Sequence, residues 1–188
     1  METAELRRMR RNQFAILNGL LIIGLFLFFI IMNMYTISIA HFFLFLGIFV
    51  LSQGIFGLMK GDSTKSIIPI VEKVAIYEKQ KMGKEWYKHR KVSYGYNIVL
   101  SGILFWQSYL NWGYEDNIFQ VDMLFMVTMF CFLLLLSNIS LIIHNRKVDR
   151  AASEVEFKGY TWKVNLLAII LGIVFAMMLL IAILILVL

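Results

Sequence analysis

The sequence predicts an all-α membrane protein, a polytopic helix bundle with five transmembrane helices. The first observation is a run of 48 consecutive residues, Asn12 to Met59, that contains no Lys, Arg, Asp or Glu. The second is composition, because 60% hydrophobic residues, 15% aromatic residues and a single Pro lie outside the usual range of soluble domains. The third is that charged residues gather between further apolar stretches. These observations predict a single transmembrane domain over residues 1–188.

Five stretches approach the roughly 20 apolar residues that a helix needs to cross a bilayer core. They are residues 14–34, 37–59, 94–112, 123–144 and 164–188. About two residues, Tyr35 and Thr36, join the first two stretches, which predicts a tight antiparallel hairpin. The acidic loop 113–122 predicts a second hairpin from the third and fourth stretches, and the fifth stretch is a single C-terminal helix.

The first apolar run follows four arginines, as in the n-region of a signal peptide. The run is too long for the apolar region of a signal peptide, and no small-x-small cleavage site follows it. We therefore expect an uncleaved first span. The single Cys131 lies inside a predicted span, so no disulfide framework is expected.

The distribution of charge predicts the orientation. All 18 Lys and Arg residues fall in the N-terminal segment, in linker 60–91 or in linker 145–163, whereas the loop 113–122 carries Glu115, Asp116 and Asp122. Positively charged loops stay in the cytoplasm, so the N-terminus is predicted inside and the C-terminus outside. The 18 basic and 9 acidic residues inside give +9, and the outer side carries −3. Orientation thus explains the basic charge, and no nucleic-acid partner is expected.

Linker 60–91 is predicted to form an amphipathic cytoplasmic helix. Apolar residues recur in it at helical spacing between charged ones, namely Ile67, Ile70, Val71, Val74 and Tyr77. Ser66 can cap this helix, Pro69 suits its first turn, and Gly83 weakens its end. Such a helix either caps its own bundle or docks on another membrane protein or on anionic lipid headgroups. The candidate docking residues are Lys73, Lys79, Lys81, Lys84, Trp86, Lys88, Arg90 and Lys91.

Polar side chains inside the predicted spans form a second candidate site. Counted from the inner ends of their spans, several lie about seven residues deep, roughly 10 Å at 1.5 Å per residue. The candidate polar layer consists of Asn18, Ser52, Gln53, Ser101, Ser137 and Asn138. It is interpreted either as interhelical hydrogen bonding or as a cytoplasm-facing vestibule for an ion, water or a lipid headgroup.

Six glycines concentrate in the first predicted hairpin, at positions 19, 24, 47, 54, 57 and 61. Gly57 and Gly61 have the spacing that lets helix backbones approach closely. This pattern indicates packing within the hairpin or, alternatively, a homodimer seam.

No catalytic, cofactor-binding or metal-binding set is recognisable. The predicted spans lack Asp, Glu, Lys and Arg, which argues against a proton-coupled carboxylate site. His41 and His144 are predicted near opposite membrane surfaces, so a joint metal site is not expected. Ser52 or Ser137 with His144 is the nearest approach to a nucleophile and base, and nothing in the sequence orients such a pair.

The sequence therefore favours a non-enzymatic integral membrane protein without a cofactor. We expect a regulatory, accessory or immunity-type subunit that acts through helix and lipid contacts with the bilayer, with another membrane protein or with its own copies. The alternative is a small oligomeric channel or permease for an ion or small solute. A composition rich in Ile, Lys, Met and Phe but poor in Pro and Ala suggests the plasma membrane of a bacterium with an AT-rich genome.

Overall fold

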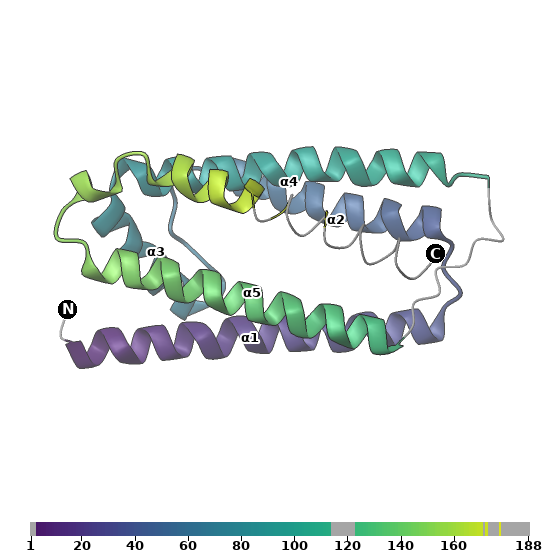
Figure 1. The fold of residues 1–188 in the computed structure, drawn as a ribbon, viewed down its shortest axis with the longest axis horizontal. Coiled ribbons are helices and arrows are strands. Elements are labelled where there is room, and N and C mark those ends of the chain that lie inside the picture. Colours follow the sequence, from purple (N-terminus) through teal and green to yellow (C-terminus); the bar gives the residue numbers. More distant parts are fainter. Residues whose placement is uncertain (1–2, 114–122, 171, 173–176, 178–188) are drawn as a thin grey trace.

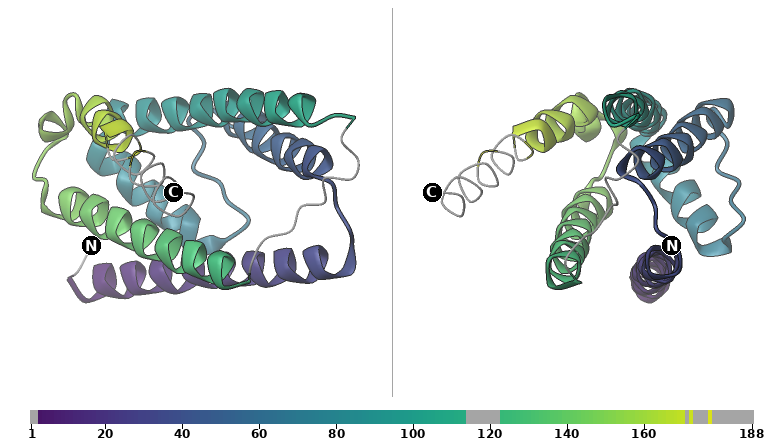
Figure 2. Two further views of the ribbon diagram at one scale, coloured as in Figure 1. Left: turned by 45° about the vertical axis from the view of Figure 1, so that its right-hand side comes forward. Right: turned by 90° about the vertical axis from the view of Figure 1, so that its right-hand side faces the viewer.

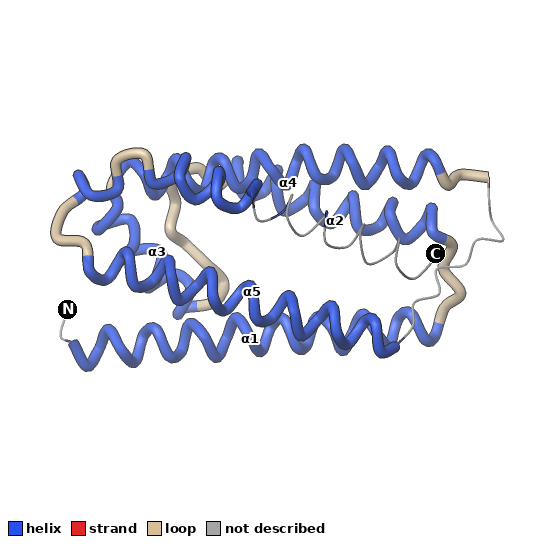
Figure 3. The backbone as a smooth tube through the Cα atoms, in the orientation of Figure 1, coloured by secondary structure: helices blue, strands red, loops and turns tan. Residues whose placement is uncertain are grey.

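The computed structural model describes residues 3–113, 123–170, 172 and 177. Helices make up 86% of the described residues, which confirms the all-helical fold class. The elements are, in order, α1 (Thr3–Met34), α2 (Ile39–Met59), α3 (Pro69–Met82), α4 (Lys84–Leu110), α5 (Met123–Arg150) and the 3-10 helix η1 (Glu154–Phe157). A further helical stretch covers residues 160–170. Figure 3 shows the tan connections between these blue helices.

Three helices are long and apolar enough to cross a membrane, which supports the prediction of a membrane protein. They cover Ala4–Ile31, Ile39–Met59 and Phe130–Arg150 of the described chain and overlap the predicted spans 14–34, 37–59 and 123–144. The predicted span 94–112 is helical within α4 but is not among the three, because polar residues such as Asn97 and Gln107 dilute its apolar content. Most of the predicted span 164–188 lies outside the described residues. Five spans are therefore not confirmed.

The observed helix pairs differ from the predicted hairpins. The partner of α2 is α4, and the two helices are antiparallel and pack along most of α2. At one end the Ser108 hydroxyl donates to the Ala40 carbonyl oxygen at 2.9 Å, and near the other end Gly57 faces the ring of Tyr94. The second pair is α1 with α5, which are also antiparallel. Figure 1 shows the α2·α4 pair above the α1·α5 pair.

Helix α3 bridges the two pairs. It contacts α1 and α5 on one side and α4 on the other, and it also touches η1. Connection 60–68 carries the chain from the end of α2 toward the α1·α5 pair, as Figure 1 and the left view of Figure 2 show. We call this end of the molecule, where the N-terminus also lies, the α3 end.

Local sequence signals account for the bounds of α3. Pro69 occupies the first turn, as predicted, where a missing N–H costs no helical hydrogen bond. Gly83 ends the helix with φ of 55°, a left-handed backbone that favours glycine. The predicted cap is wrong, because Ile68 holds the cap position and the Ser66 hydroxyl instead accepts from the Ile68 N–H at 3.3 Å.

A compact hydrophobic core lies at the α3 end. Its fully or nearly fully buried members come from α3, α4, α5, the residue after α5 and η1, and they are Met82, Trp86, Val148, Ala151 and Phe157. Trp86 was predicted to dock on lipid or a partner, but it is only 4% exposed because it fills this core. The mixed charges of linker 145–163 suggest a short solvated helix or turn, yet its Phe157 is completely buried. Burying such aromatic side chains stabilises the joint between helices by about 1.5 to 3 kcal/mol each.

Candidate functional site

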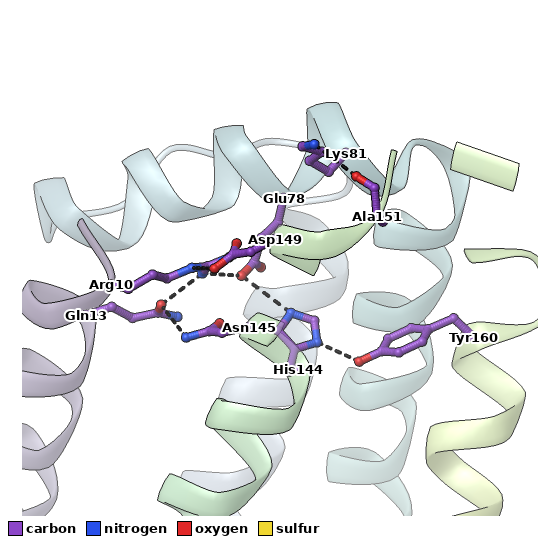
Figure 4. Close-up of polar contacts among 9 residues, drawn as sticks. All are labelled: Arg10, Gln13, Glu78, Lys81, His144, Asn145, Asp149, Ala151 and Tyr160. Carbon is purple, nitrogen blue, oxygen red and sulfur yellow. Dashed lines mark hydrogen bonds and ion pairs between the residues drawn. The ribbon is translucent and has the colours of Figure 1, made fainter. Parts of the chain in front are cut away.

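An ionic cluster centred on Arg10 lies beside this core (Figure 4). The Arg10 guanidinium binds Asp149 through two hydrogen bonds, Nη2 to Oδ1 at 2.7 Å and Nε to Oδ2 at 3.2 Å. Its Nη1 donates to Glu78 Oε1 at 3.0 Å and to Gln13 Oε1 at 2.9 Å. Arg10 is only 8% exposed, so one buried cation joins α1, α3 and α5.

Hydrogen bonds extend the cluster in two directions. On the α1 side, the Asn145 amide donates to Gln13 Oε1 at 3.2 Å. On the other side, His144 Nε2 lies 3.4 Å from Glu78 Oε1, and His144 Nδ1 lies 2.7 Å from the Tyr160 hydroxyl. A proton on Nε2 faces the carboxylate. Nδ1 then accepts from Tyr160 when the ring is neutral and donates to it when the ring is protonated.

Burial and charge shift the acidity of groups in the cluster. Burial alone would raise the pKa of Glu78, but the hydrogen bonds and charges of His144 and Arg10 outweigh it and leave that pKa below the ordinary value. Burial, aided by the charge of Glu78, raises the pKa of Tyr160 to about 12. Tyr160 therefore stays protonated over the physiological range.

His89 of α4 completes this region. Its ring stacks on His144 with centroids 6.2 Å apart and lies 5.8 Å from the Tyr160 ring. Its Nδ1 is buried with no hydrogen-bond partner among the described residues. Burial, with a smaller effect of the neighbouring His144, lowers the pKa of His89 although Glu78 and Glu85 oppose this. The neutral ring is the form that this site accommodates.

Acidification is expected to destabilise the α3 end. Unfolded His89 has the ordinary pKa of 6.5 whereas folded His89 has a lower one, so the unfolded state takes up the proton first and stability falls as the pH drops below about 6.5. Glu78, whose folded pKa is also lowered, adds a loss of the same sign below its ordinary value of 4.5. Thermal unfolding in detergent from about pH 8 to pH 5 measures the first loss.

The His89→Phe variant keeps a ring in the stack and removes the titrating group, so its profile over that range is expected to be flatter than that of the wild type. The control is His41→Phe, which changes an exposed histidine of α2 and should keep the wild-type profile. Equal profiles for wild type and His89→Phe would contradict the assignment.

The structure brings only two members of the candidate polar layer together. The side chains of Asn18 and Asn138 exchange two hydrogen bonds, of 2.9 and 2.8 Å, between α1 and α5. Ser52 and Ser101 bond to carbonyl oxygens of their own helices. Gln53 and Ser137 are exposed. The six residues therefore do not form one continuous layer, and the amide pair acts as an interhelical contact.

Removing this amide pair is expected to cost little. Interhelical hydrogen bonds in membranes contribute on average about 0.6 kcal/mol, so Asn138→Ala should lower the unfolding free energy by that order. A double-mutant cycle with Asn18→Ala measures the coupling, and Gln53→Ala is the control outside the pair. A coupling near zero would contradict the observed contact.

The eight candidate docking residues divide into three groups. Trp86 is core, as described above. Three basic residues are engaged within the chain: Lys79 pairs with Asp62 at 2.9 Å, Lys81 donates to the Ala151 carbonyl at 3.0 Å, and Arg90 stacks on Trp86 with 4.5 Å to its ring centroid. The remaining four are exposed, namely Lys73, Lys84, Lys88 and Lys91.

The sequence interpretation missed Arg10, because it treated the four N-terminal arginines together as a topology signal. A signal was nevertheless available. Gln13 lies three residues and Asn18 eight residues after Arg10, spacings that keep all three on one side of a helix, and the structure places all three against polar groups of α5. Among the described residues no three His, Cys, Asp or Glu side chains gather closely enough to hold a metal ion.

Comparison with known proteins adds no relative, since no family model, curated protein or solved structure matches this chain.

Proposed function

We propose that the protein is a non-enzymatic accessory, regulatory or immunity-type subunit in the membrane, acting through the outer surfaces of its helices. The observation that carries the proposal is that the candidate spans bury few of their own residues within the chain. None of the residues in the most apolar 18-residue window of α1 is buried, and only 17% and 11% are buried in those of α2 and α5. Most of the apolar surface is thus available to lipid or to another helix.

The polar residues of the chain support the same reading. The buried polar and charged groups at the α3 end join α1 to α3 and α5 and join α4 to the helical stretch 160–170. An apolar groove of about 760 Å³ opens between α1 and α2, lined by residues such as Phe28, Phe42 and Phe49. Such a groove suits an acyl chain or an apolar helix from a partner.

Cross-linked affinity purification of the tagged protein from its native membrane, followed by mass spectrometry, tests this function. A stoichiometric membrane-protein partner is the expected result. A preparation that contains this chain alone would overturn the accessory role.

A small oligomeric channel or permease is the second candidate. It is favoured by Gln53 and Ser137, polar side chains that are exposed on the candidate spans α2 and α5. Polar groups on a membrane-facing surface are costly unless they meet other polar groups, as they do at the centre of an oligomer. Stable homo-oligomers in mild detergent and solute flux in liposomes would favour this candidate over the first.

The proposed topology has five spans, with the N-terminus in the cytoplasm. Helix α4 belongs to it because α4 packs antiparallel along α2, a candidate span, and so lies at the same depth. We expect a reporter that is active only outside the cytoplasm to be active after Leu188 and inactive near Lys79. The opposite pattern would overturn the inside and outside assignments, and activity at neither site would contradict an odd number of spans.

A further inference from the structure

One face of α4 changes from basic to apolar along its length. Its first turns expose Lys84, Lys88 and Lys91, at intervals of four and three residues, and Tyr87, which lies three residues after Lys84 and four before Lys91. Residues with this spacing lie on the same side of a helix. The opposite side of these turns carries the buried Trp86.

The same side of α4 continues into exposed apolar residues. Val99, Ile103 and Trp106 are 63%, 54% and 60% exposed, and at 100° per residue they lie within about 120° of the three lysines. On the other flank of the lysines the helix packs on α2 through Tyr94, Ile98 and Phe105. The chain thus leaves uncovered one strip with three lysines at its start and an apolar surface above them.

Three acidic groups near this strip are largely buried. The side chains of Glu78, Glu85 and Asp149 are only 13%, 17% and 23% exposed. Arg10 binds Glu78 and Asp149, and Thr161 donates to Glu85 at 2.8 Å. Folding therefore buries these three carboxylates, whereas Glu154 and Glu156 of η1 stay exposed and the carboxyl group of Glu154 lies beside Gly83.

The lysines of the strip keep most of their charge unpaired. Lys88 lies 3.5 Å from Glu85, whereas Lys84 and Lys91 form no ion pair within the described part of the chain. Long lysine side chains reach from an apolar surface to the level of phosphate groups. Charge complementarity and the adjoining apolar surface together favour one kind of partner, a molecule with a negative head and an apolar tail.

We propose that this face of α4 is a binding site for an anionic phospholipid of the inner leaflet. Lys84, Lys88 and Lys91 contact the headgroup phosphate, Tyr87 lies beside it, and the acyl chains follow Val99, Ile103 and Trp106. The inference rests on the proposed function and topology, because it needs α4 in the membrane with its first turns on the cytoplasmic side.

The test measures lipid preference around the full-length protein in phosphatidylcholine vesicles. Trace spin-labelled phosphatidylglycerol or phosphatidylcholine reports how strongly each lipid associates with the protein. We expect the wild type to prefer phosphatidylglycerol, and salt to weaken the preference. The variant Lys84→Gln/Lys88→Gln/Lys91→Gln is expected to reduce the preference about twofold or more.

The matched control removes the same charge elsewhere. Lys65, Lys73 and Lys158 are also exposed but lie outside the α4 strip, so changing all three to Gln should keep the wild-type preference. Equal losses in the two variants, or no loss in the α4 variant, would overturn the site. Unchanged thermal unfolding in detergent establishes that the α4 variant is folded. If it is not, the single variants Lys84→Gln and Lys91→Gln take its place, each expected to lower the preference by a smaller amount.

The same variants separate this inference from the accessory role. Loss of phosphatidylglycerol preference with no co-purifying partner would uphold the lipid site and reject the accessory role. Loss of a co-purifying protein with unchanged lipid preference would mean that the strip docks a protein, which overturns the lipid site.

Discussion

The Arg10→Met variant is expected to lose about 3 to 5 kcal/mol of unfolding free energy. The reason is that Arg10 is buried and balances two carboxylates, Glu78 and Asp149, from two other helices. Removing the cation leaves both carboxylates in a site whose polar partners were arranged around it. Thermal or denaturant unfolding of the purified protein in detergent measures the loss.

The neighbouring Arg11 provides the control, because it carries the same charge but is exposed. Arg11→Met should change the unfolding free energy by less than about 0.5 kcal/mol. A second test adds Glu78→Gln and Asp149→Asn to Arg10→Met, which removes the two uncompensated charges and should restore part of the stability. Equal stabilities for Arg10→Met and Arg11→Met would contradict the importance of the cluster.

The cluster matters because the described helices meet mainly in two places. One is the contact of α2 with α4, and the other is the α3 end, where Arg10 and the core around Phe157 join the two helix pairs. Because α1 has no buried residue in its most apolar window, its attachment depends on this end. Weakening the ionic cluster should therefore affect the arrangement of the helices as well as their stability.

Several parts of this arrangement could be predicted from the sequence. Long uncharged stretches predict apolar helices, and three of them are confirmed as candidate spans. Pro69 and Gly83 mark the two ends of α3, because each limits the backbone locally and needs no knowledge of the rest of the fold. Features that depend on one residue and its neighbours along the chain could thus be predicted from the sequence.

The pairing of helices could not be predicted, because it depends on which faces fit together. The short connection at Tyr35 and Thr36 suggested that α1 and α2 pack as a hairpin, yet the small residues of α2 face α4. Gly47 and Gly57 accommodate the rings of Phe105 and Tyr94. A short loop fixes how close two helix ends are, but it does not fix which faces meet.

The interpretation of charged and aromatic residues failed for a similar reason. Arg10 and Arg11 are identical in type and adjacent, but one is buried and the other exposed. Trp86 was a candidate docking residue, whereas it fills a core built from residues up to 71 positions away, such as Phe157. Composition predicts where such residues lie along the membrane normal, and only tertiary contacts decide whether they face the chain or its surroundings.

The contact between α2 and α4 leads to the second large expected effect, a loss of stability in Gly57→Ala. A Cβ atom at Gly57 would overlap the ring of Tyr94. The overlapped atoms include Cγ of Tyr94, which cannot move far because it is bonded to the Cβ of that tyrosine. The ring has little freedom to move away, because Arg90 donates to its hydroxyl at 2.9 Å and also lies over its face. We expect Gly57→Ala to cost about 1 to 3 kcal/mol of unfolding free energy, as overpacking does in other cores.

The control for Gly57→Ala has the opposite expected sign. No atom outside its own helix lies within 4 Å of a Cβ added at Gly19, so Gly19→Ala should stabilise α1 by about 0.5 to 1 kcal/mol through helix propensity. Adding Tyr94→Ala to Gly57→Ala removes the overlapping ring, so the second substitution should cost less in that background than in the wild type. Equal changes for the two glycines would mean that α2 and α4 do not pack closely at Gly57, and the support that this pairing gives to a membrane-spanning α4 would be lost with it.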